Sequence, residues 1–259
     1  MWNRQGWVLV VIASAFAMGG VPASALPPPD VSGSWVLVEV MPAVIHLPIV
    51  GPVEMTTITA LLVRIEQVGT ELTLERTYCF QEVRTMPALV TTVIPDLFVV
   101  SLGSDTVTAW LEETPEGWRF VQPLLVDIRG AQLVDPEHDG LPTAAADPRV
   151  FDQDGDGHPG LTIHVALAGL LGGDAYVVNR TCTALDGWVL DDGFIYGAIQ
   201  WSSEQNVIAA RDPLLLASYV YNLDPDPTKH FFLMRRIAES DPCRAIRESL
   251  TELLRLPHG

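Results

Sequence analysis

The chain of 259 residues is acidic, with 32 Asp and Glu against 15 Lys and Arg and a formal net charge of −17. Such a chain repels nucleic acid and anionic lipid, which excludes a nucleic-acid-binding protein and favours calcium or cationic partners. The cysteines Cys79, Cys182 and Cys243 form no Cys-x-x-Cys pair, which argues against zinc. They allow one disulfide and one leftover thiol, and the sequence does not indicate which two pair.

The first 25 residues have the layout of a secretory signal peptide. Arg4 carries the only charged side chain, an unbroken apolar run extends from Trp7 to Ala17, and Ala23-Ser24-Ala25 has the small-x-small pattern of a cleavage site. The run is short for a bilayer span, and no later stretch is long and apolar enough to cross a membrane. We therefore expect a mature, monomeric protein without a transmembrane segment that is secreted, periplasmic or on the cell surface.

Alternation of apolar and polar residues predicts short antiparallel strands along the mature chain. The clearest case is residues 71–80, which follow a turn at Val68-Gly69-Thr70. Further predicted strands are 36–40, 57–68, 96–102, 106–112, 118–128, 161–167, 175–183, 194–201 and 230–237. Turn residues such as Pro115-Glu116-Gly117 separate these runs, so the sequence predicts an all-β fold.

Two Asp-Pro pairs mark predicted helix starts. Asp212-Pro213 predicts a short helix that ends at about Tyr221. Asp241-Pro242 predicts a C-terminal helix over about 242–255. This second helix should lie against the sheet, because one of its faces carries the side chains of Cys243, Ile246, Leu250 and Leu254.

The most specific motif is the loop 151–160, in which Asp152, Asp154 and Asp156 stand at alternate positions and a glycine follows the third. A tight loop of this form points three carboxylates inward, and a hard cation requires several oxygens at short range. An EF-hand would place a bidentate Glu where this chain has Ile163, and the residues after the loop predict a strand. The segment therefore resembles the aspartate-rich calcium loops of secreted proteins, such as thrombospondin type 3 repeats.

This resemblance implies a calcium ion held by three carboxylates and one backbone carbonyl, those of Asp152, Asp154, Asp156 and His158. The remaining ligands would come from water or from acidic residues before the loop, Asp135, Asp139 or Asp147. The alternative is an acidic, glycine-rich turn that binds nothing, because Asp-Gly pairs are common in hairpins. Bound calcium would fix a long loop and add stability rather than chemistry.

Gly33-Ser34-Trp35 opens the first predicted strand. Lipocalins and their calycin relatives begin with Gly-x-Trp in the same place, and in that family an Arg near the last strand packs on the Trp, which closes the barrel bottom. Here Arg235 and Arg236 end the last predicted strand, and a C-terminal helix follows. The chain therefore resembles a lipocalin-like antiparallel barrel, closed or nearly closed, with a long inserted loop.

The chain departs from that family in length and in its second motif, which we do not find. The excess lies mostly at 134–160 and 212–226, and 134–147 is predicted to be an elaborated loop. No linker divides residues 26–259, so we expect a single β-rich domain. The alternative fold is a β-sandwich, in which Trp35 is an ordinary core residue.

Three functions follow from these expectations. The favoured one is a secreted calcium-stabilised binding protein whose barrel holds a small apolar ligand. Aromatic residues that either line such a cavity or fill the core are Trp110, Phe120, Tyr176, Tyr196 and Trp201. The alternatives are a cell-envelope structural or interaction protein with a solid core and a carboxylate-dependent hydrolase. An enzyme is less favoured, because no Gly-x-Ser-x-Gly or His-Glu-x-x-His motif occurs and no catalytic residue is indicated.

Overall fold

The computed structural model describes residues 27–47, 51–86, 90–167, 171–191, 193–216, 218–237 and 243–254. The predicted signal peptide and the predicted start of the C-terminal helix lie outside the described residues. None of the described helices is long and apolar enough to span a bilayer.

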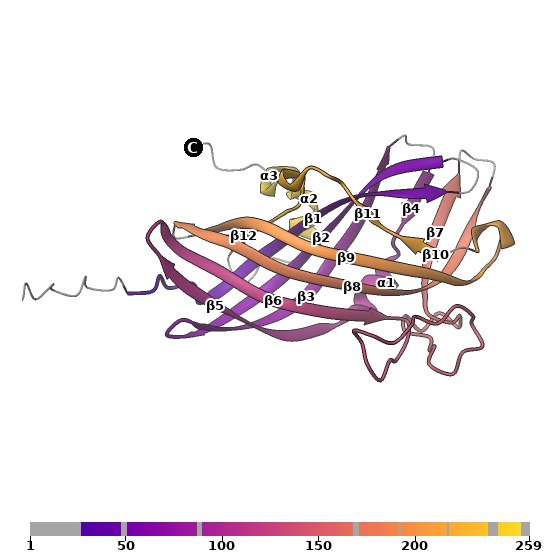
Figure 1. Ribbon diagram of the computed structural model, residues 1–259, viewed down its shortest axis with the longest axis horizontal. Coiled ribbons are helices and arrows are strands. Elements are labelled where there is room, and N and C mark those ends of the chain that lie inside the picture. The colour runs from indigo at the N-terminus through magenta and orange to yellow at the C-terminus, as the bar shows by residue number, and fades with distance from the viewer. Residues whose placement is uncertain are drawn as a thin grey trace, which may run out of the picture.

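Strands make up most of the described chain (Figure 1). They are β1 (Gly33–Leu47), β2 (Gly51–Val68), β3 (Glu71–Met86), β4 (Val90–Val93), β5 (Ser104–Thr114), β6 (Gly117–Arg129), β7 (Leu161–Leu167), β8 (Leu171–Asp191), β9 (Phe194–Ala210), β10 (Ser218–Val220), β11 (Asn222–Leu223) and β12 (Phe231–Arg236). The helices are α1 (Asp96–Leu102), α2 (Cys243–Glu248) and α3 (Leu250–Leu253), with 3-10 turns η1 (Pro213–Leu215) and η2 (Pro227–Lys229).

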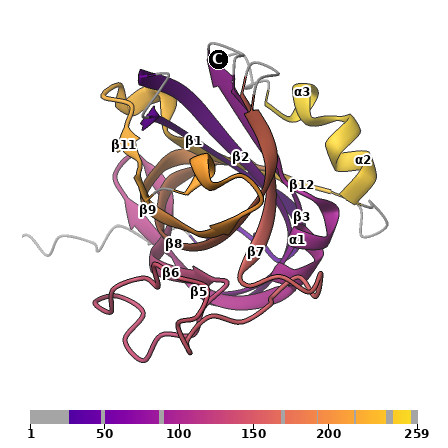
Figure 2. The same ribbon diagram turned by 90° about the vertical axis from the view of Figure 1, so that its right-hand side faces the viewer.

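Eight of the strands close into a ring in the order β1-β2-β3-β5-β6-β8-β9-β12, and every pairing is antiparallel. The ring is not a regular barrel, because four short strands are added to it. Strand β7 pairs with β8 and β4 pairs with β7, while β10 pairs with part of β9 and β11 with part of β1. Figure 2 looks along this ring, with α2 and α3 on its outer side. The predicted all-β, closed antiparallel fold is confirmed, and a single sheet replaces the sandwich alternative.

Two local predictions are wrong. Residues 96–102 form α1 rather than a strand, and the adjacent side chains of Phe98 and Val99 are both buried, which a strand with alternating faces does not allow. The helix expected after Asp212 is limited to the single turn η1, although the Asp212 carboxylate does accept from the N–H of Leu214 at 3.0 Å. Pairing with β9 draws the chain beyond this turn into β10.

The end of the ring around Trp35 is solid. The Trp35 side chain is 1 % exposed, its Nε1 donates to the carbonyl of Val31 at 2.9 Å, and the Arg236 guanidinium lies 4.7 Å from the ring centroid. Apolar side chains fill the interior beside it, among them Leu37, Leu61, Leu74, Phe120 and Phe232. The contact between Trp35 and an Arg of the last strand is therefore present.

The C-terminal helices pack on the outside of the ring, as the sequence predicts. Ile246 and Leu250 are buried there against Phe80 and Leu233. A disulfide between Cys79 of β3 and Cys243 of α2, with Cα atoms 4.9 Å apart, fixes α2 to the wall of the ring. Cys182 is the free cysteine among the described residues.

Candidate functional site

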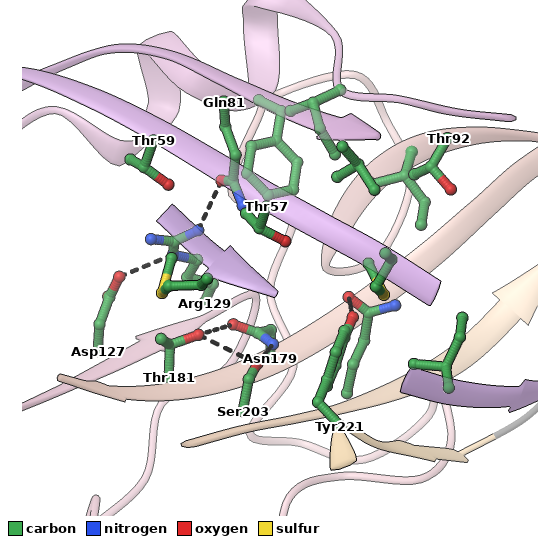
Figure 3. A pocket seen from close by; sticks show the side chains of 18 of the residues that line it. Thr57, Thr59, Gln81, Thr92, Asp127, Arg129, Asn179, Thr181, Ser203 and Tyr221 are labelled. Carbon is green, nitrogen blue, oxygen red and sulfur yellow. Dashed lines mark hydrogen bonds and ion pairs between the residues drawn. The ribbon is translucent and has the colours of Figure 1, made fainter. Parts of the chain in front are cut away.

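The ring encloses a cavity of about 180 Å³ in the half away from Trp35 (Figure 3). Much of its wall is apolar, with contributions from Met55, Val83, Phe98, Ile163, Val165 and Val207. Leu214 of η1 also lines the cavity and is 64 % exposed, so the cavity reaches the surface beside this turn. The interior therefore has a solid half and a hollow half.

A belt of polar side chains divides these two halves. Cross-strand partners point to the same face of a sheet, and the register pairs Glu39 with Thr59, Thr59 with Gln81, Asp127 with Thr181, and Thr181 with Ser203. We call these six residues the polar belt, and all of them line the cavity. Two residues away from the belt, the partners Leu37 and Leu61 belong to the solid core, so the belt forms the cavity floor.

Arg129 donates from each of its three guanidinium nitrogens within this floor. The residue is 7 % exposed, its Nε donates to Asp127 at 2.7 Å and its Nη1 donates to Gln81 Oε1 at 3.0 Å. Its Nη2 lies 3.4 Å from the hydroxyl of Tyr78, and burial raises the pKa of that hydroxyl to about 12. Figure 3 shows Arg129 between Asp127 and Gln81. The three guanidinium nitrogens therefore all have partners in the floor.

Arg76 forms a second ion pair at the floor. Its side chain lines the cavity and is almost fully buried, while its register partner on β5 is Asp105. The Nε donates to Asp105 Oδ1 at 2.8 Å and the Nη2 donates to Oδ2, which is a bidentate arrangement. Each of the two cavity arginines is thus matched by its own aspartate.

Glu39 is the remaining acidic group of the floor. It is 6 % exposed and makes no hydrogen bond or ion pair with the residues that the structure describes. Burial raises the pKa of its carboxyl, and the positive charges of Arg76 and Arg129 oppose that shift only in part. A buried carboxyl without a protein partner is thus available to whatever occupies the cavity.

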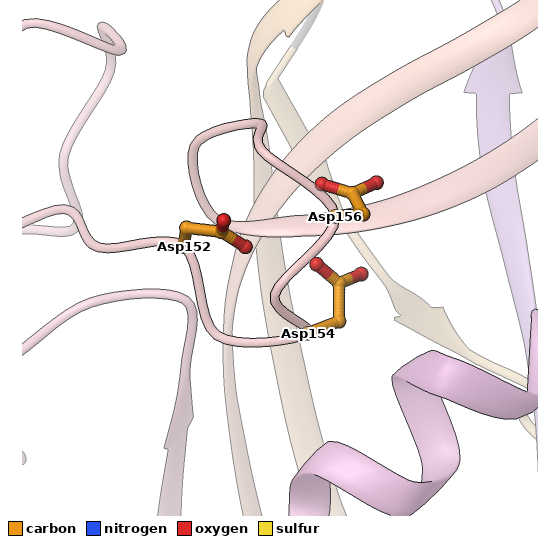
Figure 4. A group of neighbouring side chains, drawn as sticks. All are labelled: Asp152, Asp154 and Asp156. Carbon is orange, nitrogen blue, oxygen red and sulfur yellow. The ribbon is translucent and has the colours of Figure 1, made fainter.

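The aspartate loop lies outside the ring, where Asp152, Asp154 and Asp156 converge (Figure 4). One oxygen from each lies within 4.8 Å of the others. Calcium binds oxygen at roughly 2.3–2.6 Å, so two oxygens on opposite sides of one ion are separated by about 5 Å at most. The spacing of these three groups therefore fits a single calcium ion.

Hydrogen bonds from backbone N–H groups hold the carboxylates of Asp152 and Asp154 in place. The Asp152 carboxylate accepts from the N–H groups of Gly155 at 2.8 Å and Gly157 at 2.9 Å, and Asp154 Oδ2 accepts from the N–H of Thr162 at 2.8 Å. Asp154 Oδ1 is buried and has no hydrogen-bond partner among the described residues. The N–H of Gly157 is the main cause of the lowered pKa of Asp152, whereas burial, and then the charge of Asp156, raises the pKa of Asp154. A cation would supply the partner that Asp154 Oδ1 lacks.

Of the other predicted ligands, the backbone carbonyl of His158 stays a prediction, while the acidic residues before the loop do not join the group of described carboxylates. The His158 ring stacks on Tyr176, with centroids 4.3 Å apart, and the His158 N–H donates to Asp156 at 2.8 Å. The three acidic residues before the loop are bound elsewhere, because Asp147 pairs with Arg149, Asp135 contacts His138, and Asp139 accepts from the N–H of Val134. Among the carboxylates of the described part of the chain, only the three aspartates of the loop therefore converge.

The loop is fixed to the wall of the ring. Gln153 Oε1 accepts from the N–H of Gly130, at the end of β6, at 2.7 Å. Gly160 has φ of 82°, and a Cβ there would lie 2.4 Å from the carbonyl oxygen of Val177 in β8. Thr162, which donates to Asp154, directly precedes the cavity residue Ile163. The loop is thus joined directly to one side of the cavity wall.

Sequence reasoning found the aspartate loop but missed the polar belt. Of the aromatic candidates, Trp201 lines the cavity, Phe120 fills the solid core and Tyr176 lies under His158 outside the ring. The available signal was the run of polar residues at alternate positions in predicted strands, such as Asn179 and Thr181. No known protein family, curated protein or solved structure matches the chain.

Proposed function

We propose that the protein is an exported, calcium-stabilised binding protein that holds a small molecule with an apolar body inside its strand ring. The cavity carries this proposal, because a structural protein needs only a packed interior. A cavity of roughly 150 Å³ in another protein admits benzene. The present cavity of about 180 Å³ suits a ligand of similar size, one ring or a short alkyl chain.

The arrangement of the ring supports a lipocalin-like interpretation. The Arg236 contact on Trp35, the eight-stranded closure and the helix after β12 are features shared with that family. The disulfide between Cys79 and Cys243 suits an oxidising compartment outside the cytosol. These features favour an exported carrier or sensor of small molecules over a hydrolase.

Titration calorimetry with 2-phenylethanol tests the cavity as a binding site. We expect the unaltered protein to bind this probe and Val207→Phe to lose at least about tenfold in affinity, because the added ring fills the space. Val68→Phe is the matched control, since Val68 is exposed on β2 and should bind the probe normally. Failure of the unaltered protein to bind, or equal binding by Val207→Phe, would contradict the proposal.

Calcium is expected to raise the thermal midpoint of the protein. At a calcium concentration about a hundred times its Kd, binding to the folded state adds about 2.7 kcal/mol. For a domain of this size, that gain corresponds to a rise of roughly 5–10 °C. Scanning calorimetry with calcium and with EDTA measures the difference.

Asp154→Asn should abolish the calcium-dependent gain, because it replaces the carboxylate whose buried Oδ1 lacks a partner among the described residues. Glu137→Gln makes the same charge change on an exposed residue of the preceding loop and should keep the gain in full. An identical midpoint with calcium and with EDTA would show that the aspartates form a plain acidic turn.

A further inference from the structure

We propose that the cavity selects a small amphipathic amine, whose ammonium group pairs with Glu39 on the floor while its apolar body lies along the wall. This inference rests on the proposed binding function and specifies the chemical class of the ligand. Glu39 is the one cavity acid among the described residues that has no partner.

The charges of the floor favour a cationic ligand group. Arg76 is bound by Asp105 and Arg129 by Asp127, so the two guanidiniums are already balanced by two carboxylates. When Glu39 is ionised, these five side chains together therefore carry one uncompensated negative charge. A ligand ammonium would bring the net charge of the floor to zero, whereas an anionic ligand would raise the excess negative charge from one to two.

The hydrogen-bonding capacity of the floor leads to the same class of ligand. An anion would have to compete with Asp105 and Asp127 for the two guanidiniums, which already donate to these carboxylates. The Glu39 carboxylate offers only acceptors in its ionised form. A ligand that donates strongly, as an ammonium does, therefore fits the unfilled capacity of the site.

Burial makes the pairing selective. An isolated charge in a low-dielectric interior is costly, and the raised pKa of Glu39 reflects this cost. An ammonium beside the carboxylate restores a charge-assisted hydrogen bond that bulk water does not screen. A neutral ligand of the same shape gains the apolar contacts alone.

The pairing also sets the pH dependence of binding. The charged and titratable groups around Glu39 are Arg76, Arg129, Asp127, Asp105 and Tyr78. Because an ammonium binds the ionised carboxyl, a proton on Glu39 competes with the amine. Affinity for the amine should therefore fall as the pH is lowered through the raised pKa of Glu39, while affinity for a neutral ligand stays constant.

Calorimetry with two probes of matched shape tests the inference. At pH 7.5, phenethylamine should bind the unaltered protein at least about tenfold more tightly than 2-phenylethanol, the usual gain from a hydrogen bond to a charged group. Glu39→Gln should remove this preference and keep the alcohol affinity. Glu66→Gln makes the same change at an exposed position of β2 and should keep the preference.

The outcomes separate the two proposals. Equal affinity of the unaltered protein for both probes, or an undiminished amine preference in Glu39→Gln, overturns the amine inference and leaves a binding cavity. Binding of neither probe overturns the proposed function as well. If Glu39→Gln does not fold, titration of the unaltered protein over a pH series that falls from pH 7.5 decides. Only the amine affinity should fall along the series, and an amine affinity that stays constant throughout refutes the pairing.

Discussion

Replacement of Trp35 by Ala should lower the free energy of unfolding by about 4 kcal/mol, within the usual range for a large aromatic residue removed from a core. The side chain is fully buried, and its Nε1 donates to Val31, so the variant loses apolar contacts and a hydrogen bond. It also leaves a hole at the closed end of the ring, where Arg236 now covers the indole. Urea unfolding followed by circular dichroism measures the change.

Two further variants separate the contributions to this loss. Arg236→Gln keeps the indole but removes the cation above it and its hydrogen bonds to the carbonyls of Ser32 and Asp30, so we expect a cost of about 2 kcal/mol. Trp110→Ala removes a half-buried indole from β5 and should cost less than Trp35→Ala. A loss for Trp35→Ala no larger than that for Trp110→Ala would mean that Trp35 does not close the ring.

Removal of the disulfide should cost about 3 kcal/mol. Cys79 and Cys243 are separated by 164 positions, and a cross-link over so long a loop greatly restricts the unfolded chain. The bridge also holds α2 against β3, where Ile246 is buried. The double variant Cys79→Ser/Cys243→Ser should therefore unfold at lower urea concentration than the unaltered protein under oxidising conditions.

The free thiol provides the matched control for this experiment. Cys182→Ser makes the same atomic change in β8 without breaking a bridge and should stay within about 0.5 kcal/mol of the unaltered protein. Dithiothreitol should reduce the stability of the unaltered protein to that of the double variant. Equal unfolding midpoints for the double variant and the oxidised unaltered protein would show that the bridge adds no stability.

Local patterns predicted the features that depend on neighbouring residues. Alternation identified most strands, and the spacing of Asp152, Asp154 and Asp156 identified a loop whose carboxylates do converge. The same reasoning failed at residues 96–102, because a short apolar run does not distinguish a helix from a strand. It did not predict that Tyr176, brought by β8, stacks on the ring of His158.

The cavity floor depends on contacts between distant residues and could not be predicted. Glu39, Gln81, Asp127 and Ser203 come together only through the register of long strands and the closure of the ring. A shift of one residue in any pairing would turn these side chains outward. The pairing of Cys79 with Cys243 is of the same kind, because three cysteines allow three pairs and only their positions in space choose among them.

The ring joins its first strand to its last, since Trp35 of β1 is the register partner of Arg236 in β12. A chain that emerges from its amino end must therefore wait for almost the whole domain before β1 gains its second neighbour. Until then β1 presents an open edge that can pair with other chains, and closure over so large a sequence separation is slow. We expect the nascent protein to depend on a chaperone that shields β1 until β12 arrives, and pulse proteolysis of chains truncated before residue 231 would measure that exposure.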